Sequence, residues 1–275
     1  MRESRPIEAN TSEPAVTAHG ATELVLSKVP EVTLTFWIIK VLATTLGETG
    51  GDAVSMSMNL GYAVSSIIFI AIFMAAVAAQ IAAKAFHPLL YWFVILATTT
   101  AGTTMADFAD RSLGMGYAGG ASLLFLLLMA SLGIWYRSAG SVSVNTVATP
   151  GIEVFYWITI LFSQTLGTAL GDWTADTNGF GYGGGALVFV AGLALLLAAY
   201  CFTNLSRTLL FWSAFILTRP LGATVGDLLD KPTAEGGLAL SRFYASAILV
   251  ALILACILIL PQRAGSHPGA RAEAS

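Results

Sequence analysis

The sequence predicts an all-α integral membrane protein with eight transmembrane helices, arranged as four tandem two-helix repeats. Three observations lead to this fold class. The 275 residues are 56% hydrophobic and only 11% charged, with a mean hydropathy of +0.76, whereas soluble domains carry about 25% charged residues. One spacing motif occurs four times along the chain. Its copies separate apolar segments that mostly approach the ~20 residues needed to cross the hydrocarbon core of a bilayer.

The repeated motif is a tryptophan, followed ten residues later by a glycine and five residues after that by an aspartate. Its four copies indicate duplicated units: Trp37/Gly47/Asp52, Trp92/Gly102/Asp107, Trp157/Gly167/Asp172 and Trp212/Gly222/Asp227. Successive aspartates lie 55, 65 and 55 residues apart, which suggests two pseudo-symmetric halves joined by a longer linker. In the first three units a Gly-Tyr pair begins nine residues after the aspartate, at Gly61, Gly116 and Gly181.

Two apolar segments flank the aspartate region of each unit. The membrane domain is expected over residues 30–260, with repeats at about 30–84, 87–138, 150–204 and 207–260. The expected spans are 31–50, 60–82, 89–105, 117–136, 152–170, 182–203, 208–225 and 240–260. Residues 1–29 are predicted to be a flexible cytoplasmic tail with an amphipathic stretch near Leu24–Val29 on the membrane surface. Residues 261–275 are predicted to be a disordered tail.

The orientation follows from the distribution of basic residues. Both tails and the loops between units carry them, at Lys84, Arg137 and Arg207, whereas acidic residues dominate the loops within units. The positive-inside rule therefore predicts cytoplasmic termini, with the aspartate motifs at the opposite side of the membrane or dipping into it. Because each unit has an even number of helices, the units should run parallel rather than inverted.

The four repeated aspartates are the candidate ligands of a cation. Glycines just before them weaken a helix and predict a break there. Irregular backbone within a membrane is tolerated only if it is buried in protein or lines a cavity. Oxygen-rich acidic sites without histidine suit Mn²⁺, Mg²⁺, Ca²⁺ or protons. The predicted ligands are Asp52, Asp107, Asp172, Asp227 and Glu48, with hydroxyls from Thr49, Thr104, Thr168 and Thr224 around them. Alternatively, each aspartate caps a helix or a turn, and whether the motifs form one site or two stays open.

Two basic residues lie inside predicted spans, Lys40 in the first and Arg219 in the seventh. Because an unpaired cation in a membrane costs several kcal/mol, we expect Lys40 or Arg219 to pair with an acidic motif residue and to release it when a substrate or proton binds. For Lys40 the alternative is snorkelling to the interface. The position eight before the aspartate is polar in every unit and adds two candidates for the substrate pathway, Thr44 and Gln164.

The second carboxylates after the motif are expected to be solvated in loops. They are Asp110, Asp176 and Asp230, and only the pair of Asp172 with Asp176 is kept as a candidate for the pathway. The tryptophans recur at one depth, which fits either a girdle at the lipid headgroups or a wall against which a substrate stacks.

Several classes of function are excluded by missing motifs. The chain has no phosphate-binding Gly-rich loop with Lys-Ser/Thr, no HExxH, no CxxC and no set of Ser, His and Asp. We therefore expect no enzymatic activity, no cofactor and no nucleic-acid partner. The expected partners are the lipid bilayer and a small cation or solute, and a homo-oligomer is left open.

The repeated unit W…TLGT..GD…GYGGG, clearest at Trp157–Gly185, resembles a family of bacterial integral membrane proteins built from four copies of a repeat of unknown function. The resemblance covers about residues 28–260 and implies a multi-pass protein of the bacterial inner membrane, but no substrate. From the residues we expect a secondary transporter of a small cation, with a divalent metal such as manganese as the leading candidate and proton coupling left open. The alternatives are a transporter of a small organic solute and a non-transporting membrane scaffold.

Overall fold

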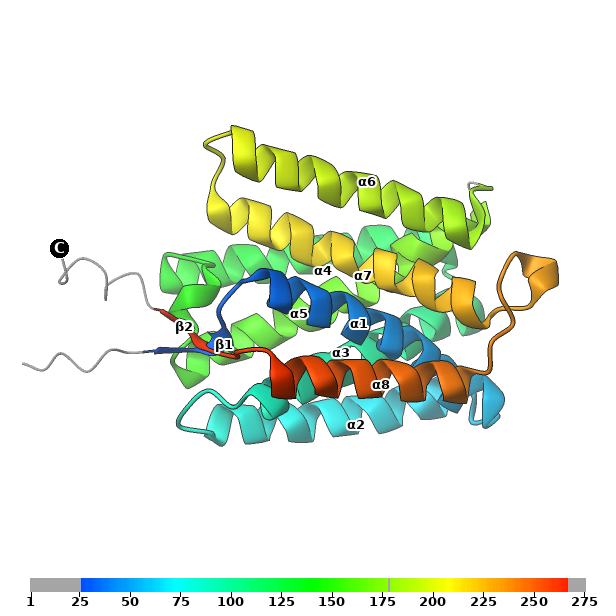
Figure 1. Cartoon of the computed structure of the whole chain (residues 1–275), viewed down its shortest axis with the longest axis horizontal. Helices are drawn as coiled ribbons and strands as arrows, with labels where there is room; N and C mark the ends of the chain where they lie inside the picture. Colours follow the sequence, from blue (N-terminus) through cyan, green and yellow to red (C-terminus); the bar gives the residue numbers. More distant parts are fainter. Residues whose placement is uncertain (1–25, 178, 267–275) are drawn as a thin grey trace, which may run out of the picture.

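Eight long helices and one short strand pair make up the computed structural model, which describes residues 26–177 and 179–266 (Figure 1). The helices are α1 (Leu34–Asp52), α2 (Gly61–Ala82), α3 (Pro88–Asp107), α4 (Gly116–Ala139), α5 (Pro150–Asp172), α6 (Gly181–Phe202), α7 (Arg207–Asp230) and α8 (Arg242–Ile259). Most boundaries lie within three residues of the expected spans. Local signals set several of the starts, since prolines open α3 and α5 and the Ser206 side chain caps α7. The largest deviation is at the end of α7, which runs five residues further than expected to Asp230.

The first helix of each unit belongs to an inner ring, and the second helix lies outside it. The inner helices contact one another in a closed cycle, α1 with α3, α3 with α5, α5 with α7 and α7 with α1. Each outer helix packs on the inner helix of the following unit: α2 on α3, α4 on α5, α6 on α7 and α8 on α1. The four units therefore follow one another around an approximate fourfold axis, beyond the two similar halves that the spacing of the aspartates indicated.

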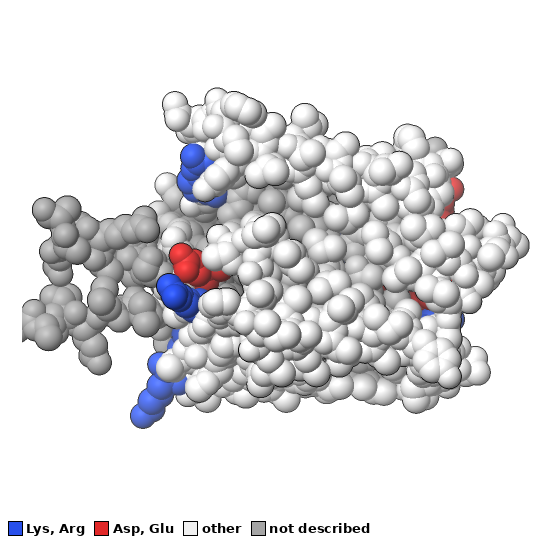
Figure 2. All heavy atoms as spheres, in the orientation of Figure 1, with Lys and Arg blue, Asp and Glu red and all other residues white. Residues whose placement is uncertain are grey.

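Hydropathy separates the two layers of helices. Seven helices are long and apolar enough to cross a membrane; α1, which carries Lys40, Glu48 and Asp52, is not among them. The mean hydropathy is 1.9–2.4 in the spans of α2, α4, α6 and α8 but 1.3 in those of α3, α5 and α7, which are far more buried. Charged side chains gather at the two ends of the face in Figure 2 and leave a broad uncharged band between them. The chain is a multi-pass membrane protein with its apolar helices outermost.

The inner helices are not broken at the motif glycines, so the predicted break was wrong. Each glycine is instead the place where one inner helix crosses the next, because a Cβ there would come too close to side-chain or backbone atoms of the neighbouring helix. The contacts are Gly47 with Thr99, Gly102 with Gln164, Gly167 with Arg219 and Gly222 with Thr44. Close helix approach in a membrane requires small residues, and this packing outweighs the low helix propensity of glycine.

The irregular backbone begins only after the aspartates. In the first three units the α-helix continues as one π-helical turn, at Ala53–Ser57, Phe108–Ser112 and Trp173–Thr177. Asp52 and Asp107 make no side-chain cap hydrogen bond, so the capping alternative does not apply to them. The following Gly-Tyr pair starts α2, α4 and α6 with φ of 72°, 69° and 63° at the glycine, a left-handed conformation that only glycine adopts without strain.

Parts of both predicted tails form a strand pair. Strand β1 (Leu26–Pro30) runs antiparallel to β2 (Ala264–Ser266) at the end of the bundle opposite the aspartates (Figure 1). The Lys28 ammonium lies 2.6 Å from the Glu153 carboxylate at the start of α5, and the Ser27 hydroxyl donates to the Val144 carbonyl at 2.9 Å. The prediction of a flexible tail was therefore wrong for residues 26–29, since the strand pair and these contacts hold them against the bundle. The remaining tail residues lie outside the described ranges.

Candidate functional site

The four repeated aspartates meet at one end of the inner ring, and we call them the aspartate ring. All four are buried, with at most 3% of each residue exposed. Arg111 contacts Asp107 at 2.8 Å and Asp172 at 3.4 Å. Lys231 contacts Asp52 at 2.5 Å and Asp227 at 3.2 Å. Two cations thus join the aspartates in two pairs.

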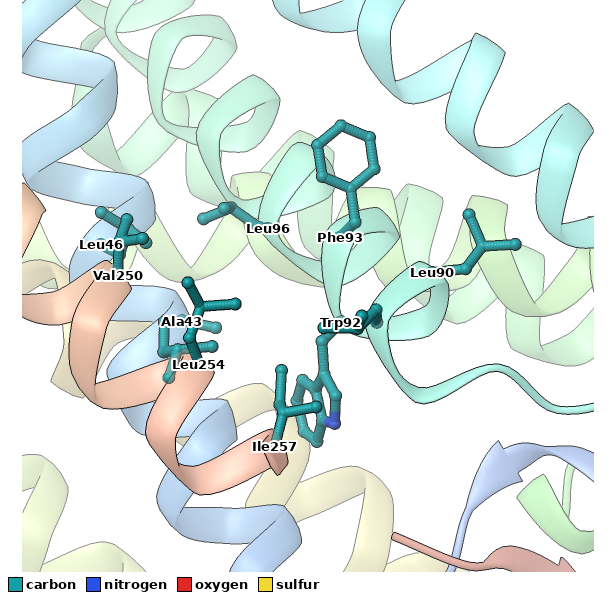
Figure 3. Close-up of a pocket in the computed structure, with 11 residues that line it drawn as sticks. Ala43, Leu46, Leu90, Trp92, Phe93, Leu96, Val250, Leu254 and Ile257 are labelled. Carbon is teal, nitrogen blue, oxygen red and sulfur yellow. The ribbon is translucent and has the colours of Figure 1, made fainter. Parts of the chain in front are cut away.

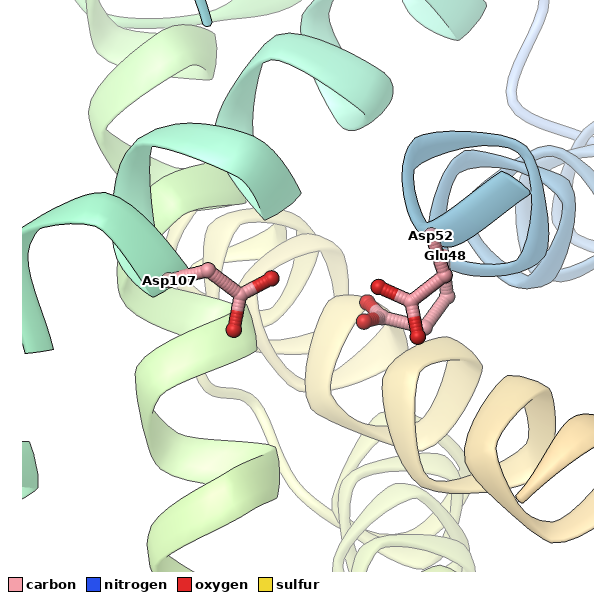
Figure 4. A group of neighbouring side chains, drawn as sticks. All are labelled: Glu48, Asp52 and Asp107. Carbon is pink, nitrogen blue, oxygen red and sulfur yellow. The ribbon is translucent and has the colours of Figure 1, made fainter. Parts of the chain in front are cut away.

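Carboxylate oxygens from different inner helices also approach one another closely, in two groups of three. Glu48, Asp52 and Asp107 each place one such oxygen within 4.8 Å of the others, and so do Asp52, Asp227 and Asp230. Figure 4 shows Glu48 and Asp52 on the same helix, with their carboxylates directed toward that of Asp107 on a neighbouring helix. Asp52 belongs to both groups, and Arg111 joins Asp172 to Asp107, so all four aspartates are connected through direct contacts.

The second and fourth units share a sequence pattern that makes these contacts, Asp-x-x-Asp followed by a basic residue. It is Asp107-x-x-Asp110-Arg111 in the second unit and Asp227-x-x-Asp230-Lys231 in the fourth. Arg111 and Lys231 lie beyond the predicted spans, and neither was among the predicted site residues. The pattern occurs in every second unit, and this recurrence is the sequence signal that would have identified the two basic residues. It also means that units one and three differ from units two and four, so the ring has twofold as well as approximate fourfold symmetry.

Two of the three second carboxylates are placed contrary to expectation. Asp110 and Asp230 are buried, and Asp230 accepts a hydrogen bond from Arg242 at 3.1 Å. Asp176, the one kept as a pathway candidate, is exposed and accepts a hydrogen bond from Tyr117 at 2.9 Å. The expectation of solvated side chains was therefore wrong for Asp110 and Asp230 and agrees with Asp176. The turn of helix after the motif points its third residue inward and its fourth, in the third unit, outward.

Lys231 lies just beyond the end of α7 and is charged at neutral pH. Burial by itself lowers the pKa of its ammonium group, but the carboxylates of Asp227 and Asp52 outweigh burial and raise the pKa above its usual value. Lys231 is therefore a fixed positive charge in the ring.

A second polar layer lies deeper in the inner ring, where the Arg219 guanidinium meets Glu48 at 3.0 Å. The same Arg219 nitrogen donates to the hydroxyls of Thr103 at 2.6 Å and Thr168 at 2.5 Å. All four inner helices thus contribute a residue to this cluster. An acidic partner was expected for Arg219, but Thr103 was missed, although it occupies the position in the second unit that Glu48 occupies in the first.

Lys40 lies in the layer below Arg219 and is completely buried. Its ammonium group donates to the side-chain oxygen of Gln164 at 3.4 Å and lies 4.1 Å from the centre of the Phe215 ring. It has no ion-pair partner in residues 26–177 and 179–266. The alternative of snorkelling is wrong, because α1 turns this face toward the axis of the ring.

The other predicted threonines do not surround the aspartates. Thr49 bonds to Ser246 on α8 at 2.9 Å. Thr44, a candidate for the substrate pathway, donates to the Thr218 carbonyl on α7 at 3.2 Å. Thr104 and Thr224 donate to carbonyl groups of their own helices. Of the four predicted hydroxyl ligands, only that of Thr168 bonds to a charged side chain, the guanidinium of Arg219, and none bonds to an aspartate among the described residues.

The inner ring is closed at its other end by eight aromatic residues, which we call the aromatic belt. Each motif tryptophan follows another aromatic residue, and that residue packs against the tryptophan of the next unit. The ring centres are 5.4–6.3 Å apart in the pairs Phe36–Trp92, Tyr91–Trp157, Tyr156–Trp212 and Phe211–Trp37. Three of the tryptophans are at most 4% exposed, so they do not form a girdle at the lipid headgroups.

An apolar groove of 470 Å³ opens between α1, α3 and α8 (Figure 3). Leu46, Phe93, Leu96 and Leu254 are among its lining residues, all of which are apolar or aromatic. Such a surface is complementary to a lipid acyl chain and not to an ion. The groove therefore lies outside the candidate cation site.

Comparison with known families gives one match. A family model described as Repeat of Unknown Function (DUF347) matches residues 35–86, 90–141, 155–206 and 210–262. Each matched segment contains most of one inner helix and the outer helix that follows it. No curated protein and no solved structure matches the chain.

Proposed function

The chain belongs to the family defined by this repeat of unknown function, and on that premise we propose that it is a secondary transporter of a small cation. A divalent metal ion such as Mn²⁺ is the first candidate for the substrate. In this proposal α1 is the eighth membrane span, and the protein lies in the bacterial inner membrane. Both termini are then cytoplasmic, since basic residues gather at the end that holds β1 and β2.

The observation that carries the proposal is the excess of buried carboxylates in the aspartate ring. Five carboxylates, those of the four aspartates and Glu48, lie close together, and four basic side chains contact them in the described residues: Arg111, Lys231, Arg242 and Arg219. Buried ionisable groups in membrane spans usually mark ion pathways, and a set of carboxylate oxygens is the coordination that hard divalent cations prefer.

Binding of a cation would then compete with the protein's own basic side chains. A metal ion between Glu48, Asp52 and Asp107 would weaken the hold of these carboxylates on Lys231, Arg219 and Arg111. Because Arg219 is also hydrogen-bonded to α3 and α5, a change in its contact with Glu48 would alter contacts among all four inner helices. This gives binding a route to a conformational change, as alternating access requires.

Two closed layers would have to open in turn. The charged aspartate ring closes one end of the inner ring of helices, and the aromatic belt closes the other. The polar residues between them, including Gln164 and Thr168, would line the path of the ion. Proton coupling is assigned to the same carboxylates, because a carboxylate that loses its cation can take up a proton.

Asparagine at Asp172 should reduce metal flux at least tenfold in proteoliposomes, because one of the ring carboxylates is lost while its shape is retained. The measurement follows Mn²⁺, Mg²⁺, Ca²⁺ and Co²⁺ entry with a metal dye and proton movement with a pH dye. Asp176→Asn is the matched control, since it makes the same change in the same unit at an exposed residue, and its flux should equal that of the wild type.

Equal flux in the two variants would show that transport does not need the Asp172 carboxylate and would remove it from the proposed ion site. If the folded and inserted wild type moved none of the four metals, the cation proposal would be refuted. A transporter of small organic solutes or a membrane scaffold would then take its place.

A further inference from the structure

We infer that the inner ring also holds a binding site for a small monovalent anion, between Lys40, Gln164 and Arg219. These side chains come from α1, α5 and α7 and are each 0% exposed. The inference goes beyond cation transport, because a site for negative charge is distinct from the carboxylates of the aspartate ring.

The charges of the Lys40 and Arg219 layers, taken together, do not balance. Lys40 and Arg219 are the basic side chains, and Glu48 is the one carboxylate that contacts either of them in the described part of the chain. Glu48 is already paired with Arg219, so Lys40 is left without a counter-charge. An unpaired buried cation costs several kcal/mol in a membrane, and a bound anion would remove this cost.

The surroundings of Lys40 make the imbalance more pronounced. The positions equivalent to Lys40 in the other three units are Ile95, Ile160 and Phe215, all completely buried. The layer is therefore apolar apart from Lys40. Leucine or methionine could fill the same space, so packing does not explain a lysine at this position. We attribute its charge to the binding of a ligand.

Buried hydrogen-bond donors without partners also favour a bound anion. The Nε and Nη1 atoms of Arg219 and the Nε2 atom of Gln164 are buried and make no hydrogen bond. Lys40 has three N–H donors but makes one hydrogen bond, the 3.4 Å contact with Gln164. Buried donors are normally satisfied. Because all of these unused groups donate and none accepts, the complementary ligand is one that only accepts, which is an anion.

The donors lie close enough together to share one small ligand. Lys40 contacts Phe215, which is four residues before Arg219 on α7, and Gln164 is four residues before Thr168, which contacts Arg219. One helical turn, about 5.4 Å, therefore separates the level of Lys40 from that of Arg219. The net excess of one positive charge selects a monovalent anion, such as chloride, nitrate or a small carboxylate.

Binding of radiolabelled chloride to the detergent-purified protein tests the inference, in metal-free sodium gluconate buffer with nitrate and formate as competitors. The wild type should bind chloride saturably at one site. Gln164→Glu should weaken binding at least tenfold, because its carboxylate supplies Lys40 with an internal partner in an almost identical shape. Lys40→Met should weaken binding to the same degree, whereas Lys84→Met, which removes an exposed lysine, should bind like the wild type.

Gln164→Glu also guards against a result caused by misfolding, since the new ion pair should raise the unfolding temperature rather than lower it. The inference is overturned if wild type binds none of the three anions saturably, or if Gln164→Glu binds chloride with unchanged affinity. The chloride-binding experiment uses no metal ion and measures no flux, so its result is independent of the test of cation transport.

Discussion

Methionine at Arg219 should lower the unfolding free energy by about 3–5 kcal/mol, the usual cost of leaving a buried charge without its partner. Glu48 would lose the guanidinium 3.0 Å away and keep only the Thr103 hydroxyl at 3.3 Å. Methionine retains the Cβ and Cγ atoms that lie closest to Gly167, so the crossing of α5 and α7 is preserved. The loss then reports the charge and not the packing. Unfolding in detergent micelles, followed by tryptophan fluorescence, measures it.

The double variant Glu48→Gln with Arg219→Met is the control for this experiment. Removal of both charges leaves no uncompensated ion, so most of the lost stability should return. A single variant within about 0.5 kcal/mol of the wild type would show that the pair does not hold the inner helices together. A double variant no better than the single one would assign the loss to the shape of Arg219 instead.

Alanine at Gly222 should destabilise the protein by about 1–3 kcal/mol, because it overpacks the crossing of α7 and α1. The added Cβ would lie 2.8 Å from the Thr44 carbonyl carbon and would overlap the Thr44 side chain. Backbone cannot yield as a flexible side chain can, so the two inner helices must separate. The midpoint of thermal unfolding and the homogeneity of the purified protein are the measurements.

Gly133→Ala provides the matched comparison. Gly133 lies inside α4, and a Cβ at this position would meet no atom within 4 Å. The same chemical change should therefore be neutral there or should stabilise by about 0.5–1 kcal/mol, since alanine is the better helix former. If the two alanine variants had the same midpoint of thermal unfolding, close contact at the motif glycines would not be what stabilises the ring of inner helices.

The sequence by itself determined the class of the protein and its periodic order. Long apolar segments, the repeated motif and the Gly-Tyr pair predicted the eight helices, most of them with ends within three residues. These features are local: helix formation and termination depend on hydrophobic spacing, on prolines such as Pro88 and Pro150, and on glycines with positive φ such as Gly61. The repeated aspartates were equally visible because a repeat shows itself without any knowledge of contacts.

Only the tertiary structure decided which residues meet. Arg219 and Glu48 are 171 residues apart, and no local pattern pairs them. The closed cycle of helices buries three of the motif tryptophans and also Asp230, which the sequence placed in a solvated loop. The physical reason is that a helix presents several faces, and packing against distant helices selects the one that faces the axis. Charges and aromatic residues that are equivalent in sequence therefore acquire different partners in the folded ring.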